Sequence, residues 1–276
     1  MFDGFELRTS RGIFLRLGGD GPPLLLLHGH PQTHAMWHAV APVLADDFTV
    51  VAADLPGYGR SAPVSSGSKR EMAAALVETM ADLGFDRFHL AGHDRGGRCA
   101  YRLALDRPGQ VERLAVLDIV PTADMWRRAD KEFGLVDWHW FFLAQPEPFP
   151  ETLIAADPNA FYFRGDRSRF HPEALGDYLA AVHDPAVIHA MCQDYRAGAT
   201  IDHELDEADL SAGRRILCPV LALWAGQDEL GRWFDVLETW RRWAADVRGR
   251  AVDAGHFLAE EKPSEVAEEL RAFFAE

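Results

Sequence analysis

Short apolar runs alternate along most of the chain with segments of helical periodicity. Apolar runs of strand length lie at 24–27, 48–53, 88–91, 114–117, 220–224 and 248–252. Such runs are typical of strands that are buried on both faces of a sheet. Helices are expected at 71–83, 98–105, 233–245 and from 264 onward. A hairpin-like pair of strands over 5–17 precedes them, so we predict a mostly parallel α/β sheet with right-handed crossovers and flanking helices.

The alternation stops between residues 122 and 214. This segment contains no buried-strand run and is rich in Trp, Phe, His and Pro, as in Trp138-His139-Trp140-Phe141-Phe142. We therefore predict an α/β core built from residues 1–121 and 215–276. A mainly helical cap, residues 122–214, is expected to be inserted after the sixth strand and to cover the site.

Charge and composition narrow the classes of partner. The 276 residues are 48% hydrophobic and 26% charged, and 43 acidic against 28 basic residues give a net charge of -15. A chain this acidic is a poor candidate for binding nucleic acid or an anionic membrane surface, although a pocket can still be locally positive. No run approaches the roughly 18 apolar residues of a membrane span, and the start lacks a signal-peptide pattern. Three widely spaced cysteines favour a reducing compartment, so we expect a cytoplasmic protein.

The segment with the clearest chemical meaning is Gly92-His93-Asp94-Arg95-Gly96. An apolar run leads into it, a helix follows, and the two glycines permit a sharp turn. The layout resembles the G-x-S-x-G nucleophile elbow of the α/β hydrolases, which exposes a nucleophile above the sheet, with aspartate in place of serine. A helix N-cap would be a simpler explanation of Asp94, but the flanking glycines favour the nucleophile.

An aspartate at this position restricts the substrate. A serine takes an acyl group from its substrate, whereas an attacking carboxylate becomes the acyl group itself. The substrate must then be an alkylating one, either a saturated carbon bearing a halide or an epoxide. Arg95 should keep Asp94 ionised, because a nearby cation lowers the pKa of a carboxyl group.

A base and an orienting acid are also expected. His256, in Asp253-Ala254-Gly255-His256-Phe257, follows the last core strand, where an α/β hydrolase places its base. It would deprotonate the water that attacks an Asp94 ester. Asp228 follows the strand at 220–224 and Asp118 follows the strand at 114–117. Either aspartate could orient His256 or simply cap a strand end, and the local sequence leaves both open.

Arg95 and Arg98 lie three positions apart, so both project from one face of the first turn of the elbow helix. Surface ion pairs would explain such a pair. Their position beside Asp94 instead favours a site for a substrate carboxylate, which two guanidinium groups and a helix N-terminus can hold.

Four histidines near the first buried strand resemble a metal cluster: His28, His30, His34 and His38. No acidic neighbour fixes their geometry and aspartate catalysis needs no ion, so no metal site is predicted. His28-Gly29 instead indicates an oxyanion loop. The backbone amides of His30 and Arg95 are the expected donors to the oxyanion that forms when an ester is hydrolysed.

Considered together, these motifs resemble those of the fluoroacetate (haloacetate) dehalogenases of the α/β-hydrolase fold. The resembling segments are His28-Gly29-His30-Pro31-Gln32, Gly92-His93-Asp94-Arg95-Gly96-Gly97-Arg98, Asp118-Ile119-Val120-Pro121-Thr122, Trp138-His139-Trp140-Phe141, Cys192-Gln193-Asp194-Tyr195-Arg196-Ala197 and Gly255-His256-Phe257. The resemblance implies that Asp94 is the nucleophile, that His256 activates water, and that Asp118 rather than Asp228 orients His256.

The resemblance also implies the substrate contacts. Arg95 and Arg98 would hold the substrate carboxylate, and three insertion residues, His139, Trp140 and Tyr195, would cradle the leaving halide. The enzyme would need no cofactor, would typically be a homodimer, and would release glycolate from a haloacetate through an aspartyl ester. His30 stands where the family usually has phenylalanine. The backbone amide survives this change, whereas the shape and charge of the pocket are expected to differ.

Two other functions fit part of the pattern. An epoxide hydrolase shares the aspartate elbow and the histidine base, but it typically opens its ring with two cap tyrosines and needs no carboxylate clamp. A non-catalytic α/β-hydrolase receptor would share the fold alone. The arginine pair, His139-Trp140 and the presence of all three triad members favour the dehalogenase.

Overall fold

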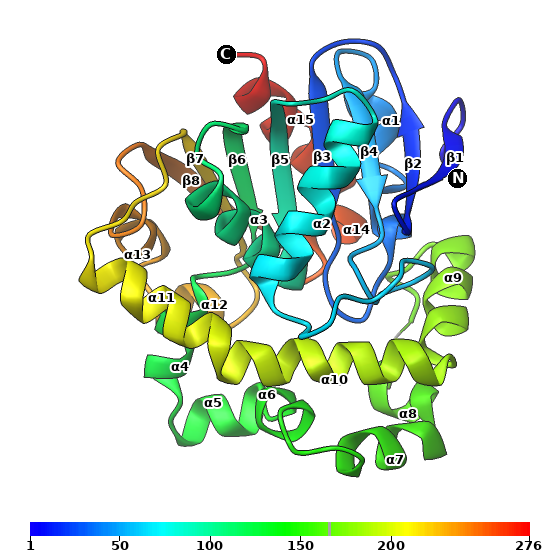
Figure 1. Cartoon of the computed structure of the whole chain (residues 1–276), viewed down its shortest axis with the longest axis vertical. Helices are drawn as coiled ribbons and strands as arrows, with labels where there is room; N and C mark the ends of the chain where they lie inside the picture. Colours follow the sequence, from blue (N-terminus) through cyan, green and yellow to red (C-terminus); the bar gives the residue numbers. More distant parts are fainter. Residues whose placement is uncertain (165–166) are drawn as a thin grey trace.

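The computed structural model describes residues 1–164 and 167–276. Within them, eight strands form one sheet in the order β1-β2-β4-β3-β5-β6-β7-β8 (Figure 1). The hairpin strands β1 (Glu6–Ser10) and β2 (Ile13–Gly18) are antiparallel to their neighbours. The other six are mutually parallel: β3 (Pro23–Leu27), β4 (Thr49–Ala53), β5 (Phe88–His93), β6 (Val111–Leu117), β7 (Val220–Ala225) and β8 (Val247–Val252). The predicted fold class, an α/β hydrolase with a mostly parallel sheet, is confirmed.

The central and edge strands bury their side chains differently. All four leucines of β3 are at most 1% exposed, as expected for a strand with helices on both faces. The edge strand β8 exposes Arg248 and Arg250 instead. Charged side chains on an edge discourage pairing with another chain. The apolar centre and the polar edges of the sheet therefore follow directly from the sequence pattern.

Helices cover both faces of the sheet (Figure 1). On one face, α2 (Lys69–Asp82) packs against α3 (Asp94–Asp106), and α3 packs on β5 and β6. On the other face, α1 (Ala41–Leu44) packs against α15 (Pro263–Phe274). The shorter elements in the core are η1 (His34–Trp37), α12 (Leu230–Trp233), α13 (Val236–Arg241) and α14 (Leu258–Glu261).

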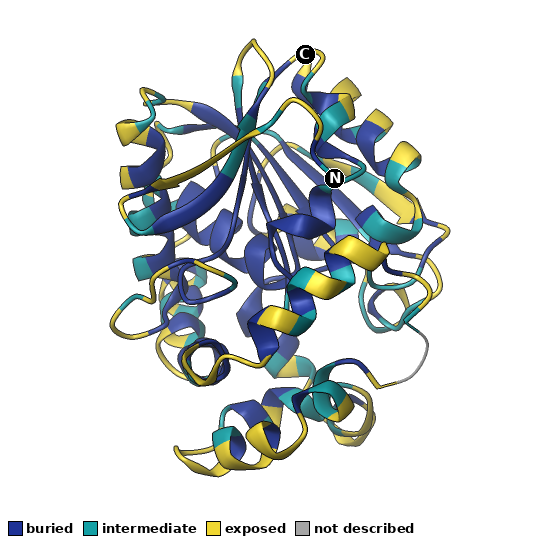
Figure 2. Cartoon of the chain, turned by 90° about the vertical axis from the view of Figure 1, so that its right-hand side faces the viewer, coloured by how far each residue is buried: buried dark blue, intermediate teal, exposed yellow. Residues whose placement is uncertain are grey.

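The segment between β6 and β7 is helical throughout its described part, and we call residues 122–214 the helical insertion. Its helices lie beyond the carboxyl ends of the strands (Figures 1 and 2), and the long α10 runs across that side of the core in Figure 1. They are α4 (Thr122–Arg128), α5 (Lys131–Val136), α6 (His139–Leu143), α7 (Phe149–Ala156), α8 (Pro158–Tyr162), α9 (Pro172–Val182), α10 (Pro185–Ala199) and α11 (Ile201–Ser211). Across the described residues, no helix has the length and apolar character that crossing a membrane requires.

Two predicted helices differ from the structure by three residues or more at an end. The elbow helix was expected from residue 98 but begins at Asp94, because its first turn contains Gly96, whose low helix propensity hides the start. The helix expected at 233–245 is limited to Val236–Arg241. The N-terminal hairpin agrees with expectation, and Arg11 and Gly12 both have positive φ, at 51° and 84°, as a two-residue hairpin turn requires.

Candidate active site

The elbow turn around Asp94 depends on two glycines. A Cβ atom on Gly92 would lie 2.4 Å from the carbonyl oxygen of Gly96, and one on Gly96 would lie 2.3 Å from the carbonyl oxygen of His28. Asp94 itself has a φ of 44°, which few non-glycine residues adopt. Such strain persists only where the surroundings impose it, and it often marks a functional site. The turn therefore places the carboxylate of Asp94 at the carboxyl end of β5.

The carboxylate of Asp94 is ionised, and one of its two oxygens accepts a hydrogen bond. The backbone amide of His30 donates a hydrogen bond of 2.8 Å to Oδ2, as expected for one of the two oxyanion donors. Burial alone would raise the pKa of Asp94, but nearby positive charges, chief among them His256, hold it well below its ordinary value. The second expected donor, the amide of Arg95, makes no hydrogen bond to this carboxylate in the described residues, so its role stays a prediction.

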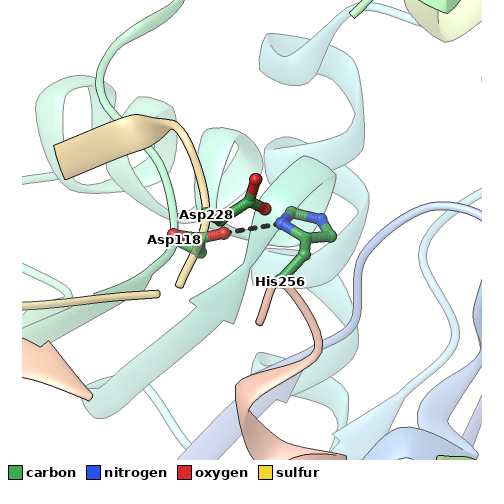
Figure 3. A group of neighbouring side chains, drawn as sticks. All are labelled: Asp118, Asp228 and His256. Atoms are coloured by element: carbon green, nitrogen blue, oxygen red, sulfur yellow. Dashed lines mark hydrogen bonds and ion pairs between the residues drawn. The ribbon is translucent and has the colours of Figure 1, made fainter. Parts of the chain in front are cut away.

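His256 is joined to Asp118 rather than to Asp228. Its Nδ1 lies 2.6 Å from Oδ2 of Asp118, and the other oxygen of Asp118 accepts a 2.8 Å bond from the amide of Ala225 (Figure 3). Asp118 has a φ of 53°, so a second non-glycine residue of the site has left-handed backbone. Asp228 lies close by: a carboxylate oxygen of Asp118, a carboxylate oxygen of Asp228 and a ring nitrogen of His256 all lie within 4.8 Å of one another. The structure thus shows a contact between His256 and Asp118, and the orienting role of Asp118 stays a prediction.

Charge around His256 favours its protonated form. Burial lowers the pKa of His256, but the hydrogen bond and charge of Asp118, and the charges of Asp94 and Asp228, raise it to about 10. The backbone of the same loop is held by His93, whose Nε2 donates to the carbonyl oxygen of His256 at 2.8 Å. No role was predicted for His93, although its place inside the elbow motif was a signal.

Arg95 is buried, at 1% exposure, and paired with a residue that the sequence analysis did not single out. Its guanidinium group donates to both carboxylate oxygens of Asp194, with Nε at 3.1 Å from Oδ2, and Nη2 also donates to the carbonyl oxygen at 3.0 Å. Its Nη1 is buried and unpartnered. The plane of the group lies over the ring of Tyr195, 4.2 Å from the ring centre. The alternative of a surface ion pair is wrong for Arg95.

Asp194 lies at the centre of a buried polar network. Besides Arg95 of α3, it accepts hydrogen bonds from Nζ of Lys69 on α2 and from the hydroxyl of Tyr58, the latter at 2.7 Å. Asp194 has no exposed surface and Lys69 is 2% exposed. Tyr195, the residue after Asp194, was predicted as a halide donor. An aspartate directly before that tyrosine was the signal that could have located the network. The network ties α10 of the insertion to two helices of the core.

Arg98 is also buried, and its partners are neutral. Its Nη1 donates to the carbonyl oxygen of Val120 at 3.1 Å and to the hydroxyl of Thr122 at 3.2 Å, while Nε is buried and unpartnered. Its guanidinium carbon lies 4.5 Å from the centre of the Trp140 ring. No carboxylate therefore pairs with Arg98 in the described residues.

A cavity of about 320 Å³ brings most of these groups together. The predicted residues on its wall are Asp94, Asp118, His256, Arg98, His30, His139, Trp140 and Tyr195. Within the wall, the ring of Tyr195 packs edge-on against those of His139 and Trp140, with centres 5.7 and 6.0 Å apart. Of the predicted site residues, Arg95 is the one that stands behind the wall. Asp137, Tyr162 and Arg164 also line the cavity and were not predicted.

The four clustered histidines have separate surroundings. Nε2 of His28 accepts from the amide of Leu55, and Nδ1 of His34 lies 2.8 Å from Asp54. His38 approaches Glu260 at 3.5 Å. The His30 ring is the member that reaches the cavity. These histidines thus bond to different parts of the core rather than to a common centre.

Comparison with known proteins assigns the chain to a family. Residues 22–263 match the family model of the α/β hydrolase fold. The chain belongs to the α/β hydrolases. Over its full length it is 45% identical to a fluoroacetate dehalogenase from Burkholderia sp, covering 96% of that protein. The suspected family is thereby confirmed.

Other relatives show how broad this family is. A soluble epoxide hydrolase from Corynebacterium sp. is 35% identical over 93% of the chain and 91% of its own length. A crystal structure of a protein from Nostoc sp PCC 7120, assigned to the α/β hydrolases, superposes with a TM-score of 0.96 at 50% identity, covering 99% of both chains. The relatives therefore include a dehalogenase and an epoxide hydrolase, the two enzyme types for which an aspartate nucleophile is suited.

Proposed function

We propose that this protein hydrolyses the carbon–halogen bond of a short 2-haloacid, such as fluoroacetate or chloroacetate, and releases the hydroxy acid. The observation that carries the proposal is an ionised aspartate on an elbow turn, sharing one cavity with Arg98 and with a histidine–aspartate pair. The full-length likeness to a fluoroacetate dehalogenase from Burkholderia sp supports it.

Unfilled donors in the site favour a substrate with a carboxylate. Arg98 has only neutral partners and an unpartnered Nε, and Arg95 has an unpartnered Nη1. A buried cation without a counter-charge is costly, and a bound carboxylate would remove that cost through charge-assisted hydrogen bonds. Arg98 would contact the carboxylate from the cavity wall, and Arg95, which stands behind the wall, would add its positive charge.

The first chemical step is displacement of the halide. Because Oδ2 of Asp94 accepts the bond from the His30 amide, Oδ1 is the oxygen free to attack the carbon that bears the halogen. A carbon–oxygen bond forms as the carbon–halogen bond breaks, and the halide leaves with the bonding electrons. His139, Trp140 and Tyr195 would donate to it, since each carries a polar hydrogen and lines the cavity.

The second step is hydrolysis of the resulting ester. Esterification removes the negative charge of Asp94, which is one of the charges that raise the pKa of His256. That pKa then falls, and His256 can accept a proton from the attacking water while Asp118 holds its ring. The amides of His30 and Arg95 would stabilise the oxyanion. Breaking the ester bond restores the carboxylate, releases the hydroxy acid and leaves one proton to depart through His256.

An epoxide hydrolase is the second candidate, because the Corynebacterium sp. relative carries that name and two tyrosines line the cavity. Ring opening by two tyrosines needs both hydroxyls directed at the epoxide oxygen. The hydroxyl of Tyr162 is instead buried in the wall without a partner. Together with the unpaired arginine donors, this placement favours the haloacid.

Halide release is the direct test. Purified protein is incubated with fluoroacetate, chloroacetate and styrene oxide, and fluoride, chloride and diol are measured. We expect halide and glycolate in equal amounts and no diol. Diol formation without halide would favour the epoxide hydrolase, and no turnover of any substrate would favour a receptor.

We also propose that the enzyme acts as a homodimer and without a cofactor. Displacement followed by hydrolysis consumes only the haloacid and water. On α7 of the insertion, Phe149 and Leu153 lie four positions apart on one helix face, at 54% and 53% exposure, and exposed apolar surface of this kind can mark an interface. Light scattering of the purified protein tests the dimer, and activity after dialysis against a chelator tests the cofactor.

A further inference from the structure

The ring of His30 has a placement that none of the roles described above uses. Its backbone amide contacts Asp94, while its imidazole lines the cavity. The ring packs edge-on against the rings of Tyr162 and Tyr195, each with a centre-to-centre distance of 5.2 Å. It also lies nearly parallel to the ring of His139, with centres 6.4 Å apart. The imidazole therefore stands beside two of the three groups proposed to receive the halide.

The two ring nitrogens of His30 differ in their surroundings. Nδ1 is shut off from solvent and has no hydrogen-bond partner. The side chain as a whole keeps some exposure, which comes from its position on the cavity wall. A neutral imidazole carries one N–H and one bare nitrogen, and buried N–H groups without an acceptor are rarer than unpaired acceptors. The hydrogen is therefore assigned to Nε2, the nitrogen with access to the cavity.

The ring is also neutral. Burial, together with the neighbouring His139, lowers the pKa of His30 to about 3. Burial lowers the pKa of His139 to about 4. At neutral pH both rings can each offer one N–H without adding a positive charge. They consequently do not compete with the arginines for the substrate carboxylate.

We propose that His30 is a fourth hydrogen-bond donor to the departing halide and a determinant of halogen preference. This inference rests on the proposed dehalogenation. Fluoride gains most from such a donor, because it is the poorest leaving group among the halides and the strongest hydrogen-bond acceptor. A phenylalanine at this position would keep an aromatic ring against Tyr195 and remove the donor.

The test is His30→Phe, with kcat/KM measured on fluoroacetate and bromoacetate. We expect a loss of about 10- to 100-fold on fluoroacetate, the range for a lost hydrogen bond to a charged group, and only a small loss on bromoacetate. His30→Gln places an amide N–H near the position of Nε2 and should recover part of the loss. His30→Leu has no donor and should not. Thermal melting of all three variants checks that the fold survives.

Inhibition by products gives a readout that does not depend on turnover. The inhibition constant of fluoride should rise in His30→Phe, while that of glycolate, which the arginines would hold, should stay as in the wild type. Equal losses on both substrates, or no recovery with His30→Gln, would overturn the inference and make His30 a packing residue. If the wild type releases no halide from any haloacetate, the proposed function itself fails, so the two failures are distinguishable.

Discussion

The two halves of the site are held in place by different means. Asp94, Asp118 and His256 follow strands of the sheet, and two of them have left-handed backbone, with φ values of 44° and 53°. Their positions are set by backbone geometry at the carboxyl ends of β5, β6 and β8. Trp140 and Tyr195 instead belong to helices α6 and α10 of the insertion. Their positions depend on how those helices dock on the core.

Docking of the insertion relies on buried polar contacts. Asp194 of α10 joins Lys69 of α2 and Arg95 of α3. Breaking a buried ion pair leaves an uncompensated charge, so such contacts fix one arrangement more than they add stability. In the proposed function, the reacting groups and both arginines belong to the core half, whereas the halide donors His139, Trp140 and Tyr195 belong to the docked half, which also holds Arg95 through Asp194. Variants of each half should therefore fail in different ways.

The largest effect is expected for Asp94→Asn in the core half. An amide is a poor nucleophile toward an alkyl carbon, so the rate of halide release should fall by roughly 10⁴-fold or more. Halide release is measured on freshly purified protein, with mass spectrometry to exclude deamidation back to aspartate. Activity above a few percent of the wild type, with no deamidation, would remove Asp94 from the proposed role.

The next effect separates the two acids beside His256. Asp118→Asn should lower kcat by about 10³- to 10⁴-fold, because the hydrogen bond to Nδ1 holds the ring in the required tautomer. Asp228→Asn should cost far less. The charge of Asp228 helps to raise the pKa of His256, so its removal lowers that pKa. The basic form then appears at lower pH, and the ascending limb of the pH–rate profile should move to lower pH. The reverse ranking of the two variants would assign the orienting role to Asp228.

Trp140→Phe addresses the docked half. It removes an indole donor and keeps the ring, so defluorination should fall by about 100-fold or more while debromination falls much less. Trp126→Phe is the matched control, because its indole donates to the carbonyl oxygen of Gly198 inside the insertion. That variant should affect both substrates equally. The same equal effect in Trp140→Phe would mean that Trp140 only packs the insertion.

The smallest effect is expected for the network behind Arg95. Asp194→Asn alone leaves both Lys69 and Arg95 buried without a counter-charge and should destabilise the fold. The double variant Lys69→Met/Asp194→Asn removes one of these two charges and no longer holds Arg95. We expect KM for chloroacetate to rise about 10-fold, the value of one charge-assisted hydrogen bond, with a smaller change in kcat. Chloroacetamide lacks the carboxylate, and equal losses on both compounds would contradict a positioning role.

Sequence reasoning was most successful in the core half. Strand ends and the elbow motif located Asp94 and His256, because parallel strands place their carboxyl ends at one edge of the sheet. Local sequence left Asp118 and Asp228 open, since both follow neighbouring strands; the resemblance favoured Asp118, and the structure shows it hydrogen-bonded to His256. In the docked half, no local pattern could indicate that Asp194 meets Lys69, because 125 positions separate them. Long-range polar pairs of this kind have no periodicity that a sequence reveals.

The proposed ester mechanism requires that the hydroxyl oxygen of the product come from Asp94, and isotope labelling tests this directly. Excess wild-type enzyme is mixed with chloroacetate in water enriched in the heavy oxygen isotope, so that each molecule turns over once. If Asp94 forms an ester and water attacks its carbonyl carbon, the glycolate hydroxyl carries ordinary oxygen and the heavy isotope appears in the peptide that contains Asp94. Heavy oxygen in the glycolate hydroxyl, with an unlabelled peptide, would mean that water attacks the substrate directly and would contradict the account.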